Sequence, residues 1–292
     1  MCYIQLYCII LVKGEQAEIF SSLNPEKEGM RMQIGAQLYT ANKRLTTLED
    51  FDAGLKKVAD IGYRSVQVSG TCDFDPAWLR DRLQENGLTC AMTHIDAERL
   101  INETEKVVAE HAIYGCRNIG LGSIPLEQRG KLEGYEQFRD TYLPVARKIR
   151  DMGAVFHYHN HRFEFEDLAG KNMLERMLED FPEDSLEFTL DLGWVAAAGA
   201  DVLRWIDLLK GRISRIHLKD YADMPTDGSI TTPAYLRPIY EGKLPYDDYI
   251  RALDKAGTEY ILVEQDWCYG EDEFDCLRRS YINVTSRFPE TK

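Results

Sequence analysis

Short runs of β-branched and apolar residues alternate with longer amphipathic stretches along the chain from residue 33 onward. This alternation is typical of repeated strand–helix units, which build a parallel sheet. Eight such units fit the pattern. The predicted strands are residues 33–39, 64–69, 89–93, 117–121, 155–159, 187–191, 214–218 and 260–264.

Residues that start and end helices support the helices predicted between these strands. Thr47 is a candidate N-cap, and Asp75-Pro76 places proline at the first helical position. Glycine closes four of the helices one or two residues before the next strand, where a left-handed residue is favoured. These glycines are Gly62, Gly87, Gly153 and Gly257. Four repetitions of one signal are hard to explain by chance.

The number and length of the units predict the fold class. Eight units in about 260 residues match a closed (β/α)8 barrel, the TIM barrel. An open doubly wound sheet would normally carry a glycine-rich phosphate turn after its first strand, whereas residues 40–44 read Thr-Ala-Asn-Lys-Arg. We therefore predict a single-domain α/β barrel over residues 31–292. Residues 1–30 lack the repeating pattern, and we predict an N-terminal extension that is poorly packed or precedes the native start.

One connection is much longer than the others. Residues 221–246, after the seventh strand, contain four prolines and two glycines. Loops of this length in compact domains are usually functional, so we expect a lid or a wall of the substrate site. An insertion without a function is the alternative.

Composition narrows the class of protein. Hydrophobic residues make up 44% and charged residues 29%, as in globular proteins. The formal charge of −14 disfavours nucleic acids and anionic membranes as partners. Seven cysteines without CxxC spacing argue against a disulfide framework and a thiolate zinc site, which favours a cytoplasmic location. The apolar residues 4–12 are too few to span a bilayer.

Polar side chains gather at the ends of the predicted strands, where barrel enzymes carry their active sites. Five of the six histidines lie at or near these ends, and the sixth, His111, is expected to be a surface or packing residue. Side chains of one phase along a strand share a face, so Asp191, His217 and Glu264 can converge inside the barrel. Further candidates are Gln37, Tyr39, His94, His157, His159, His161, Lys219, Asp266 and Trp267.

Asp191, His217 and Glu264, from strands six, seven and eight, predict a divalent-metal site. Imidazole and carboxylate ligands suit Mn²⁺, Zn²⁺, Co²⁺ or Fe²⁺, with Mg²⁺ a further candidate. Two or more oxygen ligands favour Mn²⁺.

Four segments resemble the xylose-isomerase-like barrels, a family with sugar phosphate isomerases/epimerases, inosose dehydratases, hydroxypyruvate isomerases and ketose 3-epimerases. The similarity covers about residues 32–290. The segments are Tyr158-His159-Asn160-His161-Arg162-Phe163-Glu164-Phe165, Leu190-Asp191-Leu192-Gly193-Trp194, Ile216-His217-Leu218-Lys219-Asp220 and Leu262-Val263-Glu264-Gln265-Asp266. In that family a strand-five Glu, a strand-six Asp, a strand-seven His and a strand-eight Glu hold a metal. The resemblance assigns the last three roles to Asp191, His217 and Glu264.

Two positions depart from the family pattern. His159 stands where many relatives place Glu, so either His159 itself is a ligand or Glu164 reaches back from the loop to supply a carboxylate. Whichever of His159 and Glu164 is not the ligand would then act near the substrate. Trp194 replaces a histidine that is frequent in the sugar epimerases. Trp194 and Trp267 either form apolar walls against the substrate or pack in the core.

The resemblance implies chemistry beside a carbonyl, in which a base removes a proton and the metal stabilises the resulting enediolate. Glu264 or Glu164 would be the base, and Lys219 and His161 would polarise or protonate oxygen. The alternative for Lys219 and His161 is a salt bridge to Asp220 or a hydrogen bond outside the ligand shell. The predicted substrate contacts are Gln37, Tyr39, His94, Trp194 and Trp267.

We therefore expect a metal-dependent isomerase or epimerase of a sugar, keto-sugar or keto-inositol. If the enediolate loses a β-oxygen substituent instead, the enzyme would be a lyase acting on a keto-inositol or 3-keto-glycoside. The acidic balance and the missing phosphate turn disfavour a phosphorylated substrate.

Two rivals lie outside this class. An abasic-DNA endonuclease would need more metal ligands and a basic surface, whereas a non-catalytic sugar-binding or assembly subunit would carry a degenerate site. The expected partners are a small polyhydroxylated substrate and, in a homo-oligomer, further copies of the chain, with neither nucleic acid nor membrane.

Overall fold

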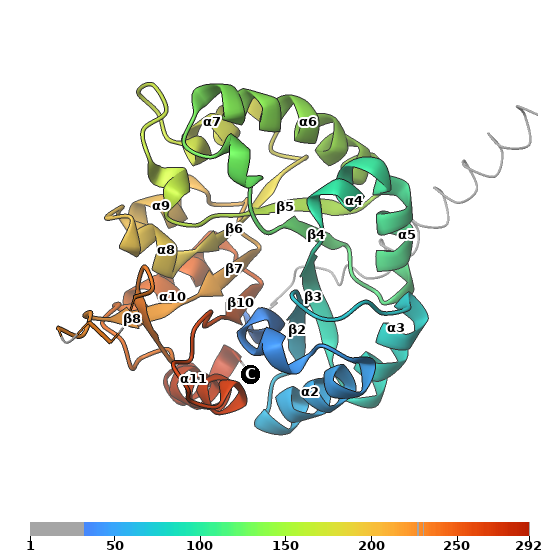
Figure 1. Ribbon diagram of the computed structural model, residues 1–292, viewed down its shortest axis with the longest axis vertical. Coiled ribbons are helices and arrows are strands. Elements are labelled where there is room, and N and C mark those ends of the chain that lie inside the picture. The colour runs from blue at the N-terminus through green and yellow to red at the C-terminus, as the bar shows by residue number, and fades with distance from the viewer. Residues whose placement is uncertain (1–31, 227, 230, 292) are drawn as a thin grey trace, which may run out of the picture.

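The computed structural model describes residues 32–226, 228–229 and 231–291. Within them, eight parallel strands close into a barrel that a ring of helices surrounds (Figure 1). The order around the barrel is β1-β10-β7-β6-β5-β4-β3-β2. The strands are β1 (Gln33–Gln37), β2 (Ser65–Val68), β3 (Thr89–His94), β4 (Asn118–Leu121), β5 (Val155–His159), β6 (Glu187–Asp191), β7 (Arg215–Leu218) and β10 (Tyr260–Val263). The predicted fold is confirmed, while the predicted extension, residues 1–30, lies outside the described residues.

The helices begin and end largely where the sequence signals place them. Thr47 Oγ1 accepts a hydrogen bond from the backbone N–H of Asp50, and Asp75 caps the helix that starts with Pro76. All four predicted closing glycines have positive φ, as at Gly257 with φ 82°. The helices are α2 (Leu48–Ile61), α3 (Pro76–Glu85), α4 (Ala97–Asn102), α5 (Thr104–Ile113), α6 (Leu132–Asp151), α7 (Met173–Asp180), α8 (Leu192–Ala197), α9 (Val202–Leu208), α10 (Tyr246–Ala256) and α11 (Glu273–Arg287).

The described residues also form four 3-10 segments: η1 (Leu38–Arg44), η2 (Leu126–Gln128), η3 (Phe163–Phe165) and η4 (Pro289–Thr291). The first strand was predicted to reach residue 39, but the chain turns into η1 after Gln37. The cause is local, because Gln37 Oε1 accepts the backbone N–H of Tyr39 and bends the chain away from the sheet. Among the described residues, no helix is long and apolar enough to cross a membrane.

The barrel interior holds a small apolar cluster beneath the polar groups at the C-terminal ends of the strands. Ala91, Met92 and Leu262 form a small buried cluster inside it. Leu262 fills space that Gly35 leaves open, since a Cβ on Gly35 would lie 2.7 Å from a Leu262 methyl carbon. Glu264 follows Leu262 by two residues and therefore points to the same side, one layer higher. Leu262 thus lies beneath the Glu264 carboxylate.

The long connection after β7 contains a hairpin that the sequence did not predict. Its strands are β8 (Asp220–Ala222) and β9 (Tyr235–Arg237), which pair antiparallel. The Asp220 carboxylate accepts four backbone N–H groups, from residues 221, 240, 242 and 244. Ala234 and Leu236 of this connection form a cluster with Trp194, against which Trp267 packs. The connection therefore supports a wall of the site from behind.

Candidate functional site

Three predicted ligands converge at the C-terminal end of the barrel. His217 Nδ1 lies 2.8 Å from Glu264 Oε2 and 3.8 Å from Asp191 Oδ2. All three side chains are buried, and these three atoms make no well-formed hydrogen bond within the described part of the chain. Two carboxylates and an imidazole that face one another in a buried site are the kind of ligand set that a divalent cation takes.

His159 completes this group. The ligand atoms of His159, Asp191, His217 and Glu264 all lie within 4.8 Å of one another. His159 Nδ1 is 3.3 Å from the carbonyl oxygen of Thr189, so Nδ1–H donates to it and Nε2 keeps its lone pair. Burial, followed by the neighbouring His217, lowers the pKa of His159 well below its ordinary value. The ring is therefore neutral, which is the form that binds a metal. We call these four residues the ligand cluster.

Glu164 is not part of the ligand cluster. Its carboxylate is buried and accepts hydrogen bonds from the Tyr158 hydroxyl at 2.8 Å and from the backbone N–H of His161 at 2.7 Å. Both oxygens are thus engaged in holding the loop after β5. Of the two alternatives for the strand-five ligand, the geometry favours His159.

Two neighbours orient the ligand cluster. His217 Nε2 lies 2.7 Å from Gln67 Oε1, an acceptor, so Nε2 carries a proton and Nδ1 is the nitrogen that faces the cluster. Asn160 Oδ1 accepts the backbone N–H of Asp191 at 2.9 Å. Gln67 was missed by the sequence analysis, and the only signal for it was its phase along β2.

Lys219 lies among three carboxylates. Its Nζ is 2.9 Å from Asp191 Oδ2, 3.0 Å from Glu264 Oε2 and 2.9 Å from Asp266 Oδ2, and the side chain is only 1% exposed. The sequence alternative of a salt bridge to Asp220 is wrong, because Asp220 is occupied by backbone N–H groups. Asp266, which the sequence analysis only noted, is thus part of the electrostatic network.

Burial and the neighbouring charges shift the pKa values of these residues in opposite directions. Burial lowers the pKa of Lys219, but the three carboxylates outweigh burial and raise it well above its ordinary value. Burial would raise the pKa of Glu264, yet Lys219 and His217 hold it well below its ordinary value. His217 follows the same pattern: burial lowers its pKa, and Glu264 and Asp191 raise it to about 9. Lys219 is therefore cationic and Glu264 ionised at neutral pH.

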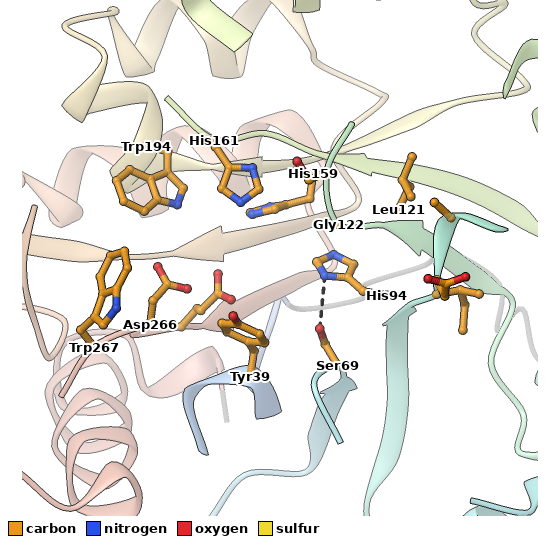
Figure 2. A pocket seen from close by; sticks show the side chains of 15 residues that line it. Tyr39, Ser69, His94, Leu121, Gly122, His159, His161, Trp194, Asp266 and Trp267 are labelled. Carbon is orange, nitrogen blue, oxygen red and sulfur yellow. Dashed lines mark hydrogen bonds between the residues drawn. The ribbon is translucent and has the colours of Figure 1, made fainter. Parts of the chain in front are cut away.

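A cavity of about 520 Å³, here called the substrate pocket, opens above the ligand cluster. Figure 2 shows Trp194 and Trp267 at one end of it and His94 with Ser69 at the other. The indole rings meet edge to face, with centroids 6.4 Å apart. The lining residues are Tyr39, Ser69, His94, Ile95, Asp96, Ala97, Leu121, Gly122, Ser123, His159, His161, Trp194, Glu264, Asp266 and Trp267.

Four of the five predicted substrate contacts line the pocket, and one does not. Tyr39, His94, Trp194, Trp267 and the candidate acid His161 line the pocket, whereas Gln37 is buried and caps η1. Residues 95–97 and 121–123 were missed, because loops after β3 and β4 carry no motif.

The remaining histidines have structural partners. His157 lies one layer below the ligand cluster and bonds Asn118. His111 is a packing residue, held by Thr93 and the carbonyl of Val107.

The chain is similar to known proteins in sequence pattern and in fold. The family model described as "Xylose isomerase-like TIM barrel" matches residues 55–278. No curated protein shows a significant match to the sequence. Solved structures similar to the chain include a sugar phosphate isomerase/epimerase from Parabacteroides distasonis, with 19% identity and a TM-score of 0.71. The alignment covers 89% of this chain and all of that one.

Two further structures show the same fold. An L-ribulose 3-epimerase is 13% identical with a TM-score of 0.68, over 89% of this chain and 95% of that one. A probable 3-DHS dehydratase from Bacillus anthracis is 14% identical with a TM-score of 0.67, over 88% of this chain and all of that one.

Proposed function

The chain belongs to the xylose isomerase-like TIM barrel family, and from this premise we propose that it is a metal-dependent isomerase or epimerase of a keto-sugar or keto-inositol. The reaction would pass through an enediolate. One observation carries the proposal: the buried ligand atoms of His159, Asp191, His217 and Glu264 lie within 4.8 Å of one another, and two of these residues, His159 and Glu264, line a cavity large enough for a small ligand.

The ligand cluster fits a divalent cation. Atoms that bind a first-row metal at about 2.1 Å lie no more than about 4.2 Å apart, so a cluster within 4.8 Å needs little contraction. Two carboxylates and two imidazoles suit Mn²⁺, which we propose, as well as Zn²⁺, Co²⁺ and Fe²⁺. A bound cation would supply Lewis-acid stabilisation for negative charge that develops on substrate oxygens.

The chain's own residues would supply the proton transfers. Glu264 lines the substrate pocket and is ionised, so it can accept a proton from the carbon beside the carbonyl. The His161 side chain is 33% exposed and lines the same pocket, where it can return a proton to oxygen or carbon. Glu164 is a weaker candidate for the base, because both of its oxygens already accept hydrogen bonds.

Other residues would position these groups and exclude water. Lys219 lies against the carboxylates and is not among the lining residues, so we assign it to holding Asp191 and Glu264 in place. The rings of Trp194 and Trp267 offer apolar faces to the C–H groups of a sugar.

The test combines metal analysis with proton exchange. Purified protein, reconstituted with Mn²⁺, is incubated in deuterated water with fructose, psicose, tagatose, ribulose or a keto-inositol, and products are read by NMR. We expect bound metal and deuterium beside the carbonyl. Asp191→Asn and Glu264→Gln should lower both metal content and exchange at least 100-fold, whereas Glu136→Gln on the exposed face of α6 should change neither. Protein that binds no metal and is insensitive to these substitutions would instead favour a non-catalytic sugar-binding subunit.

A lyase is the second candidate. Trp194 replaces the histidine that is frequent in sugar epimerases, so this position has no imidazole to exchange a proton with a substrate hydroxyl. The same enediolate could then expel a β-oxygen substituent from a keto-inositol or 3-keto-glycoside. The NMR experiment separates the two reactions, since elimination gives an unsaturated product and epimerisation does not.

A further inference from the structure

A second cavity lies beside the substrate pocket, over the loops that follow β2 and β3. Its volume is about 510 Å³, nearly that of the substrate pocket. The two cavities share four lining residues, namely Ser69, His94, Ile95 and Asp96. They therefore adjoin, and a ligand that enters one can extend into the other. Each is by itself in the size range of small-molecule sites.

The walls of the second cavity combine aromatic rings with charged groups. Phe74 and Tyr114 meet edge to face, with ring centroids 6.4 Å apart. Arg99 Nη2 lies 2.7 Å from Glu110 Oε2. Aromatic faces pack against the C–H surface of a sugar ring, while carboxylate and guanidinium groups bond its hydroxyls. Together these walls suit a polyhydroxylated ring.

The charge of this cavity argues against other occupants. Asp73, Asp96 and Glu110 line it with one cation, Arg99, which already pairs with Glu110. An excess of carboxylates repels a phosphate, sulfate or carboxylate group. An apolar tail would have to desolvate these charges without replacing their hydrogen bonds. A neutral, hydroxyl-rich group has neither problem.

The border between the two cavities offers a polar contact. Ser69 Oγ lies 3.3 Å from His94 Nδ1, the pair drawn with a dashed line in Figure 2. His94 Nε2 is buried and has no hydrogen-bond partner among the described residues. Because Ser69 and His94 line both cavities, this polar pair marks the border that a ligand reaching from one cavity into the other would pass.

We infer that the second cavity binds a glycosyl ring attached to the reacting keto-sugar, so the substrate is a glycosylated ketose of disaccharide size. The inference rests on the proposed function for the chemistry in the substrate pocket. The existence of the second ring site, however, can be tested separately from that chemistry.

The first test compares substrates. Fructose and tagatose are incubated with the Mn²⁺-loaded protein beside lactulose, turanose and isomaltulose, which are glycosylated fructoses. We expect at least one glycosylated ketose to show a kcat/KM at least tenfold above that of fructose, through a lower KM. Thr71→Trp, which fills the second cavity, should remove this advantage and leave the fructose rate unchanged. Ser286→Trp, at an exposed position of α11, is the matched control.

The second test reads binding without turnover. Cys72 lines the second cavity and is half-buried, whereas the other cysteines of the described chain are buried. Alkylation of Cys72 by N-ethylmaleimide, located by peptide mass spectrometry, should slow at least threefold with lactulose or turanose. Fructose at the same concentration should not slow it.

The outcomes separate the two proposals. Exchange with free ketoses, no preference for glycosylated ones and no protection of Cys72 would overturn the second ring site and leave the proposed function standing. Protection of Cys72 by the disaccharides without exchange on any ketose would support the ring site and contradict the proposed function. Neither exchange nor protection would contradict both.

Discussion

Replacing Lys219 by methionine should destabilise the metal-free protein and make its stability depend far more on a divalent cation. The Lys219 ammonium lies within 3.0 Å of carboxylate oxygens of Asp191, Glu264 and Asp266. All of these groups are nearly or fully shielded from water. Methionine retains an unbranched apolar chain of similar length, so the substitution chiefly removes the charge.

The size of the effect follows from burial. Removing one partner of a buried ion pair costs about 3–5 kcal/mol, because the remaining charge stays buried and unpaired. Here three carboxylates lose one cation, which favours the upper part of that range. Protonation of Asp266 would reduce this loss, because burial raises the pKa of Asp266 and a protonated carboxyl carries no charge. We therefore expect a loss of about 4 kcal/mol at pH 7, or a fall in Tm of roughly 10 °C for a domain of this size.

The assay is thermal unfolding in EDTA and in a series of Mn²⁺ concentrations. A dication in the ligand cluster replaces the missing positive charge, so saturating Mn²⁺ should reduce the deficit of Lys219→Met to about 1 kcal/mol. Lys243→Met is the control: Lys243 pairs with the exposed Asp223, and its loss should cost under about 1 kcal/mol with no metal dependence. A deficit of equal size with and without Mn²⁺ would refute the reasoning.

Three further predictions concern other parts of the molecule. His159→Gln should weaken Mn²⁺ binding at least tenfold in calorimetric titration, while Glu164→Gln should change the affinity less than about twofold. A larger loss of affinity in Glu164→Gln than in His159→Gln would make Glu164 the ligand instead. Burial lowers the pKa of His111 to about 4, so the unfolded chain takes up a proton between pH 6.5 and 4 that the folded chain does not. In urea titrations the wild type should therefore lose about 3 kcal/mol of unfolding free energy relative to His111→Gln over this pH range. Parallel pH profiles of the two proteins would contradict this. Gly193→Ala should cost about 2–3 kcal/mol in the same titrations, because its Cβ would lie 2.3 Å from the backbone oxygen of Lys219, and a neutral result would show that the chain relaxes there.

The fold was predictable because its signals repeat. The repeated pattern of eight strand–helix units predicted the barrel, even though the predicted ends of single strands differ from the observed ends by one or two residues. The two errors have non-repeating causes. The chain leaves β1 after Gln37 through one side-chain hydrogen bond, and the β8–β9 hairpin depends on Asp220 holding backbone that is about 20 residues distant. Neither contact leaves a periodic pattern in the sequence.

The site was predictable where it depends on strand phase and unpredictable where it depends on side-chain partners. Asp191 and His217 are predicted by phase alone, since in-phase residues at strand ends must point into the barrel. The preference for His159 over Glu164 rests on Tyr158, whose hydroxyl donates a hydrogen bond to the Glu164 carboxylate. For Lys219 the adjacent Asp220 in sequence suggested the wrong partner, because neighbouring residues on a strand point to opposite faces.

The charge of the site supports the proposal that His159 is the strand-five ligand, where many relatives have a glutamate. Asp191, Glu264 and Asp266 contribute three negative charges and Lys219 one positive charge. Once metal binding removes the Nδ1 proton of His217, two negative charges remain beside a neutral His159. A divalent cation would balance them, whereas a glutamate at position 159 would leave the buried site with an uncompensated charge. A balanced site favours an uncharged sugar. No lysine or arginine is among the described lining residues of the substrate pocket, so a phosphate placed there would bring negative charge without a partner.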